Sequence, residues 1–191
     1  MKTLVNSILC TLTFCGVSIG FVHAAAYDAE QAAALAQILP RSKLSLGDGI
    51  RQVSKGDEVA ISAKFELDDN GKLSLSVYTA EKGLAVDPEH NVLKEFSGSP
   101  EQNSWAPNVE VFQDLPHVAR ASQHLALMAI SRHSLMDVIA LAKKHHQGMV
   151  FSVTPTVKAA RPVAVVILAD RGRIAELDCD LRTGKCVVSG N

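Results

Sequence analysis

Residues 134–146, Ser-Leu-Met-Asp-Val-Ile-Ala-Leu-Ala-Lys-Lys-His-His, predict an amphipathic helix with one apolar face. Ser134 followed by Asp137 has the spacing of a capping box, in which each side chain bonds the other residue's backbone. Strand-like runs follow as far as Val188, and the last two are joined by the turn Asp180-Leu-Arg-Thr-Gly184. The C-terminal part of the chain therefore reads as a helix followed by antiparallel strands.

The first half of the sequence repeats this pattern. Ser45-Leu-Gly-Asp-Gly-Ile50 matches Ser134-Leu-Met-Asp-Val-Ile139 at an offset of 89 residues, and Asp87-Pro-Glu-His-Asn91 matches Asp180-Leu-Arg-Thr-Gly184 at an offset of 93. We therefore predict an α+β fold of two tandem, pseudo-symmetric units, each with two helices followed by a small antiparallel sheet of three to four strands. Its helices should cover one side of each sheet only.

The domain boundaries are predicted from changes in composition. Residues 1–24 combine Lys2 with an apolar run, which is typical of a secretory signal peptide; an uncleaved membrane anchor is the alternative. Residues 25–98 form the first unit, 99–116 a Pro-containing linker, and 117–191 the second unit. Helices are expected at 27–39, 45–55, 117–130 and 134–146, and strands at 58–67, 72–79, 84–86, 92–96, 149–157, 162–169, 173–179 and 185–188.

Overall charge and hydropathy limit the classes of partner. The formal net charge is −1, and phosphate binding needs a clustered basic face, so we expect no nucleic-acid partner. Beyond residue 24 no apolar stretch approaches the length of a membrane span. These features predict an exported protein, periplasmic or secreted, without a membrane span once the signal is cleaved.

The cysteines predict one disulfide. Cys10 and Cys15 leave with the signal peptide, while Cys179 and Cys186 flank the last turn and should face each other on adjoining strands. Directly opposed residues have Cα atoms about 4.5–5.5 Å apart, which is within bridging range. Cys-x6-Cys alone supplies too few ligands for zinc.

Catalytic and metal sites have little support in the sequence. Metal binding would need several histidines to converge, and their scattered spacing predicts no tight metal. There is no Gly-x-Ser-x-Gly or His-Glu-x-x-His motif, so we predict no catalytic residue and no cofactor. Asp87 and Asp180 are better explained as turn residues that accept backbone hydrogen bonds. The histidines considered are His117, His124, His133, His145 and His146.

Ser134-Leu-Met-Asp-Val-Ile, the strand pair around Asp170-Arg-Gly172 and Asp180-Leu-Arg-Thr-Gly-Lys resemble the PepSY domain, a small α+β module of exported bacterial proteins. Ser45-Leu-Gly-Asp-Gly-Ile and Asp87-Pro-Glu-His-Asn provide the match in the first half, with Asn91 where that family favours Gly. The tandem layout is also similar to β-lactamase inhibitor proteins, whose concave sheet binds an enzyme.

Three interpretations of function follow. The first is a non-enzymatic exported binding module, a protease or hydrolase inhibitor or regulator that acts through protein–protein contact. Its partner would be another exported protein, such as a peptidase or other hydrolase. The alternatives are a periplasmic metal-binding protein that uses the histidines and an enzyme of an unrecognised type.

Overall fold

The computed structural model describes residues 29–189 except 69 and 172. The predicted signal peptide, with Cys10 and Cys15, lies outside these residues. In chain order the elements are α1 (Ala29–Ile38), η1 (Leu39–Arg41), α2 (Leu46–Val53), β1 (Val59–Leu67), β2 (Leu73–Ala80), β3 (Leu93–Gly98), β4 (Asn108–Val111), α3 (Leu115–Ala129), α4 (Leu135–His145), β5 (Met149–Lys158), β6 (Arg161–Asp170), β7 (Arg173–Asp180) and β8 (Cys186–Val188). No helix among them is both long and apolar enough to cross a membrane.

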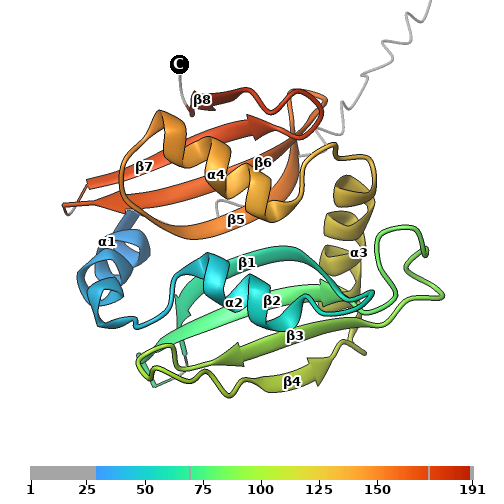
Figure 1. The fold of residues 1–191 in the computed structure, drawn as a ribbon, viewed down its shortest axis with the longest axis horizontal. Coiled ribbons are helices and arrows are strands. Elements are labelled where there is room, and N and C mark those ends of the chain that lie inside the picture. Colours follow the sequence, from blue (N-terminus) through green and yellow to red (C-terminus); the bar gives the residue numbers. More distant parts are fainter. Residues whose placement is uncertain (1–28, 69, 172, 190–191) are drawn as a thin grey trace, which may run out of the picture.

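All eight strands form one antiparallel sheet in the order β4-β3-β2-β1-β5-β6-β7-β8 (Figure 1). The chain runs outward twice from the centre, first from β1 to β4 and then from β5 to β8. The two sets meet where Ala63 and Lys64 of β1 pair with Val153 and Ser152 of β5. The prediction of two units with a small sheet each is therefore wrong, because β1 and β5 share their inner edges and merge the strands into one sheet.

One row of apolar side chains crosses the whole sheet on a single face. Directly opposed residues on neighbouring strands point to the same side, so the pairings define this row without ambiguity. Helices α2 and α4 cover this face, and Leu46, Ile50, Leu135 and Val138 are buried against it. From edge to edge the row is Val109, Phe96, Val77, Ala63, Val153, Val166, Leu177 and Val188.

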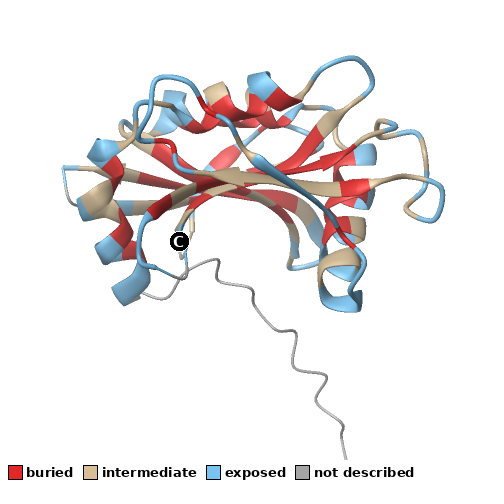
Figure 2. Ribbon diagram, turned by 90° about the horizontal axis from the view of Figure 1, so that it is seen from below, coloured by how far each residue is buried: buried red, intermediate tan, exposed pale blue. Residues whose placement is uncertain are grey.

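The next row of opposed residues points to the other face and is polar except for Ile167. Figure 2 shows the sheet as an arch, with α2 and α4 above it and α1 and α3 below its two ends. The expectation that helices cover one side only is thus wrong for α3, because His124 of this helix bonds Ser62 on the polar face. The polar row runs Asn108, Ser97, Ser76, Lys64, Ser152, Ile167 and Glu176.

Two local predictions also need correction. Residues 99–116 were predicted to be a linker, but 108–111 form edge strand β4, and Trp105 and Phe112 are buried beside it. Residues 84–86 were predicted to be a strand, but they lie in the turns between β2 and β3. In both places the local composition was misleading because pairing depends on which strand lies alongside.

Two local features recur in both halves of the sheet, and the first of them was predicted. Ser45 with Asp48, and Ser134 with Asp137, form complete capping boxes at the starts of α2 and α4. Register shifts occur at Ala60/Ser62 in β1 and at Val150/Ser152 in β5. The two halves therefore share local geometry, although their strands form a single sheet.

Candidate binding face

The face of the sheet opposite α2 and α4, called here the open face, carries a network of charged side chains in the first half. Lys64 pairs with Glu66, and the Ser76 hydroxyl donates to Glu66 Oε1 at 2.6 Å. The Lys64 ammonium lies 5.8 Å from the centroid of the Tyr78 ring. The lysine and Glu66 side chains keep only 25% and 29% of their exposure, so this pair is shielded better than an ordinary surface ion pair.

Glu95 is the least compensated member of this network. It opposes Tyr78 on one side and Glu110 on the other. Burial raises the pKa of Glu95, as do the charges of Glu66 and Glu110, although Ser76 and Lys64 oppose the shift. Like charges directly opposite each other on neighbouring strands are destabilising. The first half of the open face therefore holds negative charge at a cost in folding energy.

Helix α3 bounds the network at one end. Its His124 is buried, and Nδ1 lies 3.0 Å from the Ser62 hydroxyl. Burial lowers the pKa of His124 to about 4, and the charges of Arg120 and Lys64 act in the same direction. The imidazole is neutral at neutral pH and serves as a hydrogen-bonding core residue rather than as an acid–base group.

In the second half of the sheet, one lysine neutralises the acidic side chains. Lys158 Nζ lies 2.8 Å from Glu176 Oε1 and 2.7 Å from Asp178 Oδ1. Ser189 also donates to Asp178 at 2.8 Å. Burial alone would lower the pKa of Lys158, but its bonds to Asp178 and Glu176 outweigh this effect and raise it. This part of the face is polar, but its charges are paired.

The structure does not bring the candidate histidines together. His117 bonds Asp114 at 2.7 Å and stacks on Phe112, while His124 is buried on Ser62. His133 lies against Gly184, and His146 Nδ1 lies 2.6 Å from the carbonyl of Gln147. Within the described part of the chain, no three His, Cys, Asp or Glu side chains are grouped as metal ligands would be.

Both predicted aspartate turns have the expected hydrogen bonds. Asp87 Oδ1 accepts from the backbone N–H of residues 89 and 90 at 3.0 and 3.2 Å. Asp180 Oδ1 accepts from those of residues 182 and 183 at 2.9 and 2.8 Å. The bond from the Thr183 N–H is the largest effect that lowers the pKa of Asp180. These two carboxylates therefore hold the backbone of their own turns.

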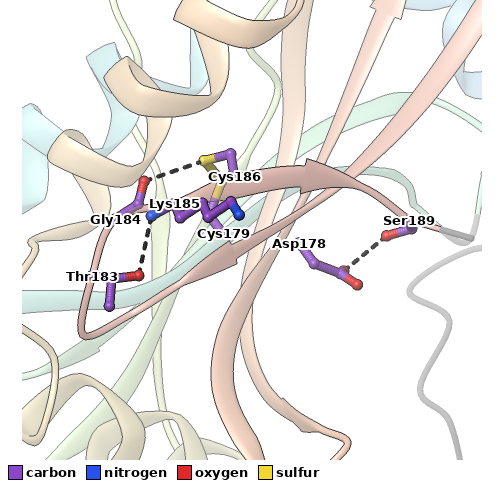
Figure 3. The surroundings of a disulfide bond; sticks show 7 residues. All are labelled: Asp178, Cys179, Thr183, Gly184, Lys185, Cys186 and Ser189. Carbon is purple, nitrogen blue, oxygen red and sulfur yellow. Dashed lines mark hydrogen bonds between the residues drawn. A yellow bond between two sulfur atoms is a disulfide. The ribbon is translucent and has the colours of Figure 1, made fainter. Parts of the chain in front are cut away.

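Cys179 and Cys186, predicted to pair, form a disulfide with Cα atoms 4.0 Å apart (Figure 3). The two residues are directly opposed on β7 and β8, and both are buried. The bond closes the last hairpin, whose turn is also joined by the Gly184 N–H to the Asp180 carbonyl at 2.8 Å. Sequence spacing alone was enough to locate this pair.

Comparisons with known proteins assign no family to this chain. No protein-family model matches it, so the resemblance to the PepSY domain gains no support. A segment of 110 residues is 28% identical to malpinin synthetase from Mortierella alpina, which covers 58% of this chain but 1% of that protein. A crystal structure from Clostridium difficile 630, provisionally described as a lipoprotein, aligns with 15% identity and a TM-score of 0.39 over 76% of this chain and 91% of that one. Similarities this low identify neither family nor activity.

Proposed function

We propose that this protein is a non-enzymatic exported binding module that docks another exported protein on its open face. The observation that carries the proposal is the partly buried charge on this face, above all Glu95 between Tyr78 and Glu110. Uncompensated charge lowers stability, and a binding surface is one place where a protein retains such a cost. An apposed basic surface would turn the same carboxylates into paired ones.

Charge selects the chemistry of the partner. Around the polar row the strands contribute five carboxylates and two lysines, so the complementary surface is rich in Lys or Arg. The Cys179–Cys186 disulfide and the signal-like residues 1–24 support an oxidising compartment for both proteins. The residues concerned are Glu66, Glu95, Glu110, Glu176, Asp178, Lys64 and Lys158.

A quantitative capture experiment tests this proposal. Immobilised protein is exposed to an extract of exported proteins, and a captured protein is then purified and titrated against wild type and a Glu66→Lys/Glu176→Lys variant. We expect the reversal of two charges on the open face to weaken binding by about tenfold or more. The matched control, Asp57→Lys/Glu101→Lys, reverses two exposed charges outside the sheet and should leave the affinity unchanged.

Captured peptidases and other hydrolases should be assayed first, because the proposed binding module includes an inhibitor or regulator of such enzymes. Inhibition that disappears in the open-face variant would establish a regulator of that enzyme. If no exported protein binds, or if both double variants lose the same affinity, the open face is not the docking surface.

A further inference from the structure

A hollow at the end of the sheet carrying the β7–β8 turn is lined by three arginines from three separate segments. Arg132 lies between α3 and α4, Arg161 begins β6, and Arg182 lies in the β7–β8 turn. The hollow has a volume of about 330 Å³, and Asp180 is its acidic lining residue. Thr183, Ala160 and Pro162 complete the lining.

Backbone hydrogen bonds around buried Leu181 hold these segments together. Its N–H donates to the carbonyl of Pro162 at 3.0 Å, and its own carbonyl accepts from the Arg132 N–H at 2.9 Å. The Ser131 hydroxyl also donates to this carbonyl, at 3.1 Å. Each arginine therefore lies at, or next to, a residue that takes part in these hydrogen bonds. These bonds fix the backbone of the three segments before any ligand arrives, while the three arginine side chains are exposed.

A tight turn sets the position of Arg161. Lys158 pairs with Arg161, so Ala159 and Ala160 alone connect β5 to β6. Both have positive φ, 48° and 59°, which is the conformation of a type I′ turn and is unfavourable for alanine. Such a turn leaves little freedom in the direction that the first residue of β6 takes.

The three guanidinium groups are only partly balanced, because Asp180, whose pKa is lowered by the hydrogen bond from the Thr183 N–H and also by the charge of Arg161, is the one acidic residue among those described that line the hollow. Among the described residues, none of the three arginines forms an ion pair within 4.0 Å. Asp180 already accepts two backbone N–H groups through Oδ1. Three arginines against one carboxylate leave the hollow positively charged. The planar forks of arginine suit the oxygens of carboxylates and phosphates.

We propose that this hollow binds a small polyanion, a molecule with two or more phosphate or carboxylate groups. A volume of about 330 Å³ is at the lower end of small-molecule pockets and exceeds what one isolated phosphate needs. Arg161 opposes Lys158, so the hollow adjoins one end of the open face, but none of its described lining residues belongs to the polar row. Binding of a small anion here does not depend on the proposed protein partner.

Calorimetric titration at about 150 mM salt tests the site, because surface charges are screened there to about 8 Å. Tripolyphosphate and citrate serve as probes, so a preference for one identifies the anionic group. We expect Arg161→Gln and Arg182→Gln each to weaken binding by about tenfold or more. The control Arg173→Gln removes an exposed arginine at the opposite hairpin and should change the dissociation constant by less than about twofold.

Three results would overturn the proposal. They are the absence of binding by either probe below about 1 mM, equal weakening by the Arg173→Gln control, and binding to phosphatidylglycerol vesicles that neither probe displaces. Thermal unfolding of each variant verifies that the fold is intact. The open-face variant Glu66→Lys/Glu176→Lys should still bind the probe, which separates a failure here from a failure of the protein-docking function.

Discussion

The turn after β2 and the turn after β7 begin in the same way and are completed differently. Both use an aspartate to accept two backbone N–H groups. After β2, the Asn91 side chain makes four hydrogen bonds, to backbone groups of residues 82, 83, 86 and 92. After β7, Gly184 and the Cys179–Cys186 disulfide replace it. One backbone geometry can thus be held by an amide network or by a covalent bond.

The same comparison extends to the helices and the open face. Gly49 in α2 stands at the position that corresponds to Val138 in α4, and Leu75 occupies the space that a Cβ at Gly49 would need. Glu95 has only partial compensation, whereas Lys158 pairs with both Glu176 and Asp178. The first half tolerates unpaired charge and the second half does not. This difference can be tested position by position.

The largest effect is expected from exchanging the two helix residues. A Cβ at Gly49 would lie 2.6 Å from Leu75 Cδ2 in the core, so Gly49→Val should lower the free energy of unfolding by about 3 kcal/mol through overpacking. Val138→Gly should cost about as much, because it removes a buried side chain and weakens the helix. Urea denaturation measures both, with exposed Lys143→Ala as the control. A neutral Gly49→Val would show that both helices pack alike.

The second-largest effect is expected from removal of the disulfide. Cys179→Ala/Cys186→Ala should lower the free energy of unfolding by about 2.5 kcal/mol, because the closed loop is short. Hydrogen exchange should show faster exchange in β7 and β8 and unchanged protection in β1 and β2. Equal loss of protection in both halves would mean that the bond supports the whole sheet.

Asn91 is the counterpart of the disulfide. Asn91→Ala removes four hydrogen bonds and should cost about 2 kcal/mol, less than their sum because part of the loop is solvent-exposed. Asn91→Asp keeps the acceptor and removes the donors, so its denaturation midpoint should fall between those of wild type and Asn91→Ala. Unfolding of the first half of the sheet in the Asn91→Asp variant alone would contradict the view that the donor and acceptor bonds of Asn91 share this role.

The smallest effect concerns pH. The pKa of Glu95 is raised above its usual 4.5, so the stability linked to its protonated form is present below that value and is lost as pH rises through the folded pKa. Glu95→Gln should therefore stabilise the protein at pH 7, by up to about 1 kcal/mol, and should have little effect near pH 3. Denaturation at both pH values measures this. Glu176→Gln, which removes a partner of Lys158, should destabilise at pH 7 instead.

Local features of this fold could be read from the sequence, and long-range ones could not. Ser-x-x-Asp located both capping boxes, and the spacing of Cys179 and Cys186 located the disulfide, because each depends on residues close in the chain. Alternation identified β1 and β2 but gave no sign that the inner edge of β1 meets β5. Pro155 of β5 lies beyond Ser152 and Val153, the residues that pair with β1, so it does not interrupt this junction.

The candidate sites show the same difference between local and long-range features. The arginine hollow was missed because its three basic residues are distant in sequence and meet only in the folded sheet, through the β6–β7 pairing and the bonds of Leu181. Strand β4 could have been suspected from Trp105 and Phe112, which a free linker would not need to bury. The open face needed the strand pairings, since one row of residues comes from seven strands.

The junction of β1 with β5 has a consequence for the order of folding. Ala63 and Val153 are 90 residues apart, whereas each pairs within its own half with a residue 13 or 14 positions away. Loop-closure entropy favours the short connections, and rates fall as contacts become less local. We expect the two meanders, β1 to β4 and β5 to β8, to form first. The β1–β5 junction should close after the rate-limiting barrier. A φ-value near 0 for the Ala63–Val153 coupling, measured by a double-mutant cycle of Ala63→Gly and Val153→Ala, with higher values for contacts inside each meander, would show it.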